Sequence, residues 1–148
     1  MTDQDPKATL FQFFNEIGII EQLARARLEA VLPHGLKVSQ FSVLNHFVRL
    51  GGAWGPARLA KAFQVTKPSM TNTIQRLEAL GFVDVGPDPE DGRGKSVTLT
   101  QAGREAHTAA LKALGPNLET LLQDLSLGPF EDALPSLTKI RGYLDQNR

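Results

Sequence analysis

The chain has 148 residues, of which 41% are hydrophobic, which suits one globular domain or one domain with extra helices. Its 16 basic and 16 acidic residues balance, so a nucleic-acid partner has to be argued from local clusters of charge. The absence of cysteine excludes disulfides and thiolate metal sites. The first residues do not resemble a signal peptide, and no apolar stretch approaches the ~20 residues of a membrane span. We therefore expect a cytoplasmic protein without a membrane partner.

Residues Pro6 to Leu32 predict one long helix, because apolar residues recur three and four positions apart. Phe11 and Ile19 place further apolar side chains outside that stripe. Two interpretations stay open, namely that the helix crosses the core of its own domain or that it also packs on a second subunit. Residues 33–35, with a proline and a glycine, are expected to end it.

A second helix is predicted from Ser39, which suits an N-cap, to Leu50. The glycine pair 51–52 stops it. Pro56 then opens a short third helix that ends at Ala62. Trp54, just before that helix, is expected to anchor the core or a brief strand.

A tight turn at 64–66 leads into a fourth helix that begins at Lys67 or Pro68. The turn supplies a threonine cap, and an apolar stripe on the helix faces the core, leaving the polar positions toward solvent. The stripe consists of Met70, Ile74, Leu77 and Leu80. A short helix, a tight turn and a second helix with small polar residues in its first turns form the helix-turn-helix pattern.

Such a helix suits DNA, because short side chains let its end approach the bases in the major groove. Asn72 can pair with adenine in two hydrogen bonds, and Arg76 can reach a phosphate or a guanine. Lys67 and Ser69 suit phosphates. The alternative interpretation is an ordinary surface helix over 66–80.

Two short strands follow, the first at Phe82, Val83 and Val85, and the second around Val97 and Leu99. The tip between them runs from Gly86 to Lys95 and is rich in proline, glycine and charge. An arginine at such a tip suits a narrow minor groove. We expect Arg93 to take this role and Asp91 to hold it, although a solvated charged loop is the alternative.

Thr100 is expected to cap a fifth helix, Gln101 to about Leu125, with a kink or break near Gly115 because Pro116 follows. A sixth helix is predicted from Pro129 to Asp145. The three histidines do not form a metal-binding pair, and no arrangement of residues indicates catalysis or a bound cofactor. We expect no enzyme activity, cofactor or metal.

The segments TKPSMTNTIQRLEALGFV and DPEDGRGKSVTLTQAG resemble the MarR family of transcriptional regulators. The second contains the D-x-R pattern, a following basic residue and an L-T-x-x-G run. The resemblance implies a mainly α fold with a small β-hairpin wing, in a single chain over 1–148. The winged helix-turn-helix then covers about 37–100, and dimerisation helices cover about 6–34 and 101–148.

The resemblance further implies a homodimer that reads a near-palindromic operator with half-sites about 34 Å apart. The expected DNA contacts are Lys67, Pro68, Ser69, Asn72, Thr73, Arg76, Arg93 and Lys95. Release by a small aromatic or phenolic effector is also implied, with a pocket formed by Phe13, Phe14, Ile17, His34, Phe41 and His46. The alternative for those six residues is ordinary core packing.

The sequence therefore predicts a transcriptional regulator, with repression favoured. The alternative is a winged-helix protein-interaction module that no longer binds DNA. One departure from the family bears on this choice, because Gly92 stands where many members carry an additional wing arginine.

Overall fold

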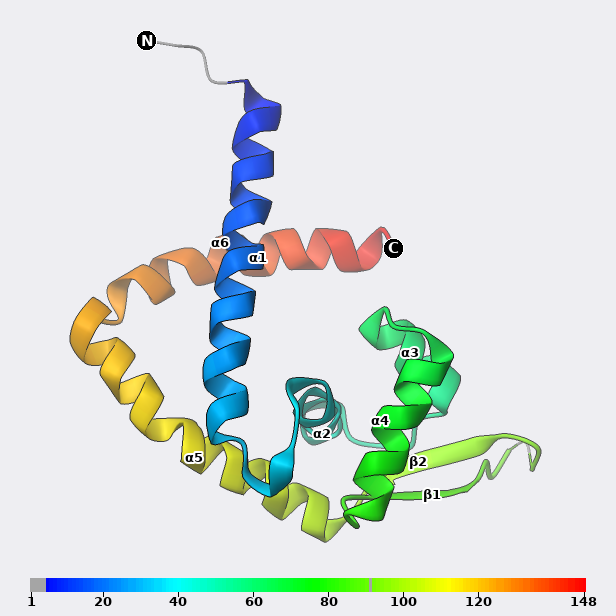
Figure 1. Ribbon diagram of the computed structural model, residues 1–148. Coiled ribbons are helices and arrows are strands. Elements are labelled where there is room, and N and C mark those ends of the chain that lie inside the picture. The colour runs from blue at the N-terminus through cyan, green and yellow to red at the C-terminus, as the bar shows by residue number, and fades with distance from the viewer. Residues whose placement is uncertain (1–4, 91) are drawn as a thin grey trace. The chain divides into compact units, whose positions relative to one another are not determined.

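The structure is a computed structural model that describes residues 5–90 and 92–148 (Figure 1). The chain divides into two compact units, Met1–Ala113 and Leu114–Arg148, and the division falls inside one helix. The helices are α1 (Pro6–Val31), α2 (Val38–Leu50), α3 (Pro56–Phe63), α4 (Lys67–Ala79), α5 (Gln101–Leu125) and α6 (Gly128–Gln146). A 3-10 turn η1 (Pro33–Gly35) follows α1, and strands β1 (Val83–Pro87) and β2 (Lys95–Leu99) form the hairpin. These elements confirm the predicted fold class.

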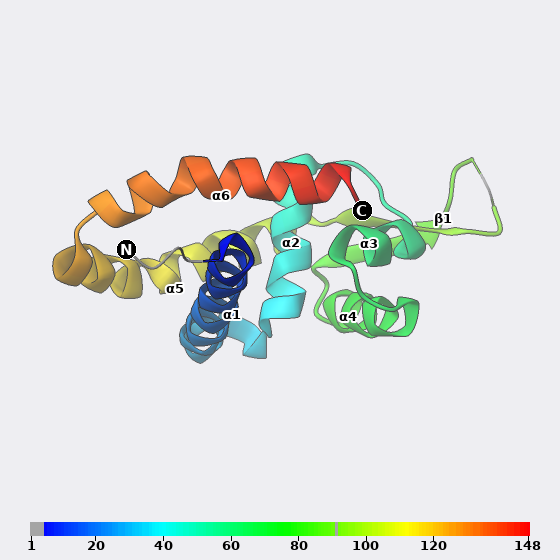
Figure 2. The same cartoon turned by 90° about the horizontal axis from the view of Figure 1, so that it is seen from above.

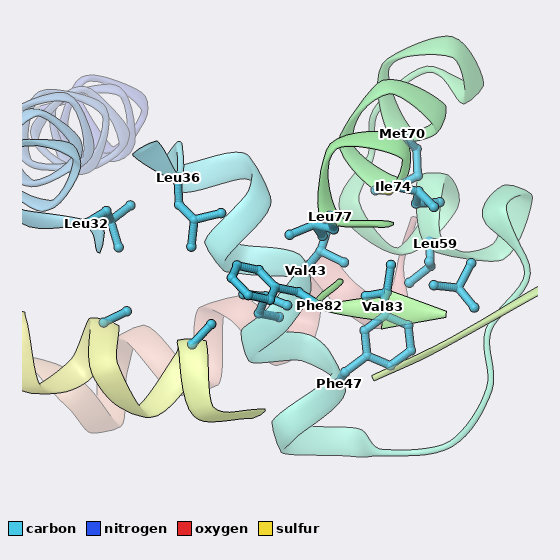
Figure 3. Close-up of a cluster of buried hydrophobic side chains, with 14 of the residues drawn as sticks. Leu32, Leu36, Val43, Phe47, Leu59, Met70, Ile74, Leu77, Phe82 and Val83 are labelled. Carbon is cyan, nitrogen blue, oxygen red and sulfur yellow. The ribbon is translucent and has the colours of Figure 1, made fainter. Parts of the chain in front are cut away.

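The core of the first unit lies where α2, α3 and α4 meet the base of the hairpin. Figure 3 shows side chains from these elements gathered in one cluster, among them Phe47, Leu59, Leu77 and Val83. All four are completely or almost completely buried. Burying side chains of this size is the main stabilising contribution available to the unit.

α1 contributes little to that core, since none of its residues is buried. Only its last turns approach it: Leu28 packs against the cluster, and the Glu29 carboxylate accepts a hydrogen bond of 3.1 Å from the amide of Val38 in α2. Phe11 and Leu23 are 74% and 62% exposed. The interpretation that this helix crosses the core of its own domain is therefore wrong for the single chain.

The contact from Glu29 also explains why α2 begins earlier than predicted. The N-cap is Lys37, not Ser39, and the side chain of Gln40 accepts a hydrogen bond of 3.0 Å from the Lys37 amide. Because Glu29 already satisfies the next amide, the helix needs no hydroxyl cap. The start depends on a residue nine positions earlier.

The hairpin projects away from α2, α3 and α4, as Figure 2 also shows. Its strands pair antiparallel, with Val85 opposite Val97 and Pro87 opposite Lys95. The predicted tip, Gly86 to Lys95, is therefore too long, because both ends of that range belong to the strands. Pro87 is tolerated at a strand end, where the amide that it lacks is not needed by the ladder. The connection is closed by a 3.0 Å hydrogen bond from the Asp88 amide to the Gly94 carbonyl.

The hairpin joins α5 through Thr100, which caps that helix as predicted. Its hydroxyl oxygen accepts a 3.0 Å hydrogen bond from the amide of Gly103 and donates one of 2.6 Å to the carbonyl of Gly81. The Thr100 amide in turn donates to the Phe82 carbonyl at 3.1 Å. One residue thus connects the end of α4, the hairpin and α5.

The second unit contains the end of α5 and all of α6. The sequence predicts a kink or a break near Gly115. α5 is continuous through Pro116, so the helix does not break there. An apolar hollow of about 240 Å³ lies at the turn between these helices and is lined by Leu118, Leu121, Leu122, Leu127 and Phe130. None of the helices in the described ranges is both long and apolar enough for a membrane span.

Candidate nucleic-acid interface

The polar face of α4 is set by burial of its opposite face. Met70, Ile74 and Leu77 are buried, which confirms the inward stripe up to that point. Leu80 packs on the core only partly buried. Most of the predicted DNA-contacting residues on this helix are therefore exposed, namely Lys67, Pro68, Ser69, Asn72 and Arg76.

The remaining predicted contact on α4, Thr73, is half-buried, and its hydroxyl donates to the Ser69 carbonyl at 3.2 Å. The start of the helix is fixed by Thr66, whose hydroxyl oxygen accepts from the Ser69 amide at 3.2 Å. Arg76 lies farther along, near the turn after α1, with Nη2 4.0 Å from where a Cβ would stand at Gly35. The first turn of α4 is thus polar and exposed, and its start is fixed by the Thr66 cap.

The hairpin supplies the second set of predicted contacts. Arg93 and Lys95 are both exposed, Arg93 in the connection and Lys95 at the first position of β2. The turn before them is ordered by the Asp88 carboxylate, which accepts a 2.9 Å hydrogen bond from the Glu90 amide. Asp91, predicted to hold Arg93, lies outside the described residues.

A cleft of about 690 Å³ lies between the hairpin and the starts of α3 and α4. Three cationic residues line it, one from each element: Arg58, Lys67 and Lys95. Asp88 and Glu90 line it from the hairpin. Sequence reasoning identified Lys67 and Lys95 but missed Arg58, for which the only available signal was a basic residue two positions after the Pro56 helix start.

Trp54 is a strand anchor, as predicted. It pairs with Val97 of β2 through two backbone hydrogen bonds of 3.0 and 2.9 Å, and its indole N–H donates to the Gly51 carbonyl at 3.0 Å. The Trp54 ring packs against the ring of His46, with 4.3 Å between the two ring centroids. The guanidinium carbon of Arg58 lies 3.8 Å from the centroid of the Trp54 ring, a cation–π arrangement.

His46 is 6% exposed and packs against Trp54, Phe47 and Phe63. Its Nε2 is buried and lacks a hydrogen-bond partner within residues 5–90 and 92–148. Burial lowers the pKa of His46 below 6.5, and the charges of Arg49 and Arg58 lower it further. This histidine is therefore neutral in the folded protein near pH 7.

The other residues predicted for an effector pocket lie in several different surroundings. Phe13 and Phe14 contact each other on α1, where Phe14 and Ile17 are exposed. His34 packs edge-on against Phe82. Phe41 stacks on His107 at 5.4 Å between ring centroids, whereas His46 contacts the rings of Phe47, Trp54 and Phe63.

His107, on the part of α5 within the first unit, has a polar partner. Its Nε2 lies 2.9 Å from the side-chain oxygen of Asn45, within hydrogen-bond distance. Burial and the nearby Arg104 lower the pKa of His107. The described part of the chain holds no group of three histidine or acidic residues placed to bind a metal.

Comparison with known proteins places this arrangement in a family. A model of the MarR family matches residues 34–94, from the turn after α1 to the hairpin connection. A crystal structure of a MarR variant from Escherichia coli complexed with operator DNA is similar with a TM-score of 0.73 and 25% identity. It covers 93% of this chain and 99% of the other. Residues 34–94 of this chain therefore match the MarR family, and the fold resembles that of a solved MarR structure.

Curated relatives extend the comparison to sequence. An uncharacterized HTH-type transcriptional regulator of Mycobacterium leprae is 41% identical over 78 residues, 53% of this chain and 54% of that protein. The transcriptional activatory protein BadR of Rhodopseudomonas palustris is 29% identical over 131 residues, 86% of this chain and 75% of that protein. The chain thus spans about half the length of the first of these relatives. The antiparallel hairpin is the wing of a winged helix.

Proposed function

We propose that this chain is a sequence-specific DNA-binding transcriptional regulator of the MarR family. The observation that carries the proposal is the pairing of an exposed polar first turn on α4 with a projecting wing that bears Arg93 and Lys95. α4 enters the major groove, where Asn72 reads adenine and Arg76 a guanine or a phosphate. The wing contacts the minor groove or its phosphates. Lys67, Pro68, Ser69 and Thr73 complete the contact set at the start of the helix.

The proposed assembly is a homodimer on a near-palindromic operator. Support comes from exposed apolar residues on α1 and, separately, on the second unit, since extended exposed apolar surface commonly marks a protein–protein interface. On α1 they are Leu10, Phe11, Phe14, Ile17, Ile19, Ile20 and Leu23, and on the second unit they include Leu118, Leu122, Leu127, Phe130 and Leu134. A second copy related by a two-fold axis would bury the same face on both chains and place two copies of α4 one DNA turn apart.

The test of the dimer is the sedimentation mass of an Ile20→Glu variant. Ile20 is 60% exposed in the single chain and lies outside the buried core, so the substitution leaves that core intact. We expect the wild type to sediment as a dimer and the variant as a monomer. Gln12→Glu, which adds the same charge on the same helix, is the control and should remain dimeric. A monomeric wild type at micromolar concentration contradicts the dimer.

DNA binding is tested with the region upstream of the chain's own gene. Arg93→Ala should weaken binding to specific and random duplexes alike and reduce the dependence of affinity on salt. Asn72→Ala should change base preference at one position by about 1–3 kcal/mol. An unaltered salt dependence removes Arg93 from the interface, and an unaltered base preference removes Asn72.

The alternative function is a winged-helix protein-interaction module. The balanced charge of the chain and Gly92 in the wing favour it. Absence of any shift of the upstream DNA at low salt would select this alternative. Our proposal for the regulator includes no enzymatic activity and places it in the cytoplasm with its DNA.

Regulation is proposed to be repression that a small aromatic or phenolic compound relieves. Phe13, Phe14, Ile17, His34, Phe41 and His46 remain the candidate residues that the family resemblance implies. A panel of such compounds should lower DNA affinity in the wild type, and Phe41→Ala should reduce that response. Stronger operator binding on addition of the compound would indicate an activator instead.

A further inference from the structure

The cleft between wing, α3 and α4 contains a cation, Arg58, that packs on an aromatic ring. Arg58 stacks on Trp54, and Trp54 is itself bound to β2 through both of its backbone hydrogen bonds to Val97. A surface arginine normally samples many rotamers, and ordering it costs conformational entropy on binding. Stacking on a fixed indole face reduces that cost before any partner arrives.

The cleft also joins the two surfaces already proposed to meet DNA. Lys67 stands at the first position of α4 and Lys95 at the first position of β2, and both line the cleft together with Arg58. The start of α3 passes close to the wing, since a Cβ at Gly55 would lie 3.5 Å from the Lys95 carbonyl. A sugar–phosphate backbone that runs from α4 to the wing therefore passes Arg58.

We propose that Arg58 is a further phosphate contact of the DNA interface and that Trp54 is its positioning residue. The inference rests on the proposed DNA-binding function and deepens it. A guanidinium that packs on an aromatic ring through its carbon can still donate N–H groups to a phosphate. The contact adds a cation to an interface in which Gly92 contributes none.

The acidic wall of the cleft sets how strong this contact is. Asp88 is held by the Glu90 amide within the wing turn, whereas the Glu90 side chain is at an exposed position. Three cationic and two acidic residues leave a small positive excess in the cleft. We therefore expect Glu90→Gln to raise DNA affinity at low salt, the direction opposite to Arg58→Ala.

The experiment measures binding to a mixed-sequence duplex of about 30 base pairs by fluorescence anisotropy, across about 0.05–0.2 M salt. Each lost phosphate contact lowers the slope of log affinity against log salt by about 0.9. Over that fourfold salt range, the ratio of variant to wild-type Kd should therefore change about 3.5-fold per subunit for Arg58→Ala.

Arg141→Ala is the matched control, because it removes the same charge from α6, where Arg141 and Asp145 form an exposed pair at 3.8 Å. Its salt slope should equal that of the wild type. Arg58→Lys keeps the charge but loses the planar stack, so we expect a retained slope with weaker binding. An Arg58→Ala slope equal to that of the wild type overturns the assignment of Arg58.

The role of Trp54 is tested by a double-mutant cycle. Trp54→Leu should weaken DNA binding when Arg58 is present and have no further effect in the Arg58→Ala background, whereas a general loss of folding would act in both. Trp54→Phe retains an aromatic face and should bind DNA nearly as tightly as the wild type does. This variant provides the test if Trp54→Leu does not fold. Additive effects overturn the positioning role. A wild type that binds no duplex refutes the proposed function itself.

Discussion

Gly103 provides the sharpest test of how the wing is joined to α5. A Cβ at this position would lie 2.1 Å from the Phe82 carbonyl oxygen and 2.7 Å from a methyl carbon of Leu99. The first of these atoms is backbone, so it cannot turn away as a side chain can. The Phe82 carbonyl must retreat by about 0.9 Å to reach even a 3.0 Å separation.

The cost of Gly103→Ala follows from this displacement. Overpacking of this kind costs about 1–3 kcal/mol. The same carbonyl accepts the hydrogen bond from the Thr100 amide, and weakening it adds about 1 kcal/mol. Alanine is better than glycine inside a helix by about 1 kcal/mol, which offsets part of the loss. We expect a net destabilisation of about 1–3 kcal/mol.

For a chain of 148 residues, the unfolding entropy is about 0.3 kcal/mol per kelvin, so the melting temperature should fall by about 3–10 °C. Circular dichroism at matched protein concentration measures this, because dimer formation also shifts the melting temperature. Gly142→Ala is the control: nothing lies within 4 Å of its added Cβ, and it should melt at or above the wild type. A Gly103→Ala variant as stable as the wild type would refute the reasoning.

Three further substitutions test the site. Thr66→Ala removes the cap that accepts from Ser69, which should cost about 1 kcal/mol and lower the melting temperature by about 3 °C, whereas Thr108→Ala, which removes only a bond within α5, should not. His46→Phe should flatten the pH dependence of the unfolding free energy. Burial lowers the pKa of His46, so the unfolded state binds more protons than the folded state does. The stability that is present above pH 6.5 is therefore lost as the pH falls. An equally steep decline in that variant would exclude His46 as the cause. Gly92→Arg should tighten DNA binding and steepen its salt dependence, because no atom lies within 4 Å of a Cβ there; unchanged binding would place this part of the wing away from DNA.

The sequence by itself determined the parts of the fold that depend on neighbouring residues. The buried stripe of α4, the tight turn before it and the Thr100 cap all arise from spacings of a few positions, and the structure confirms them. Gly81 likewise ends α4 with a φ of 78°, and the Phe82 amide donates to the Leu77 carbonyl at 2.9 Å. Such local hydrogen bonds and periodicities are written in consecutive residues.

Tertiary structure decided the features that join residues distant in sequence. Glu29 moves the start of α2, the Phe82 carbonyl explains why a glycine stands at Gly103, and only folding places Arg58 beside both Lys67 and Lys95. The exposure of α1 was also not predictable from local sequence. A periodic apolar stripe predicts that a helix face is buried, but it does not indicate which surface buries it. Periodicity fixes which side of a helix is apolar, whereas the partner of that side depends on contacts that no local pattern encodes.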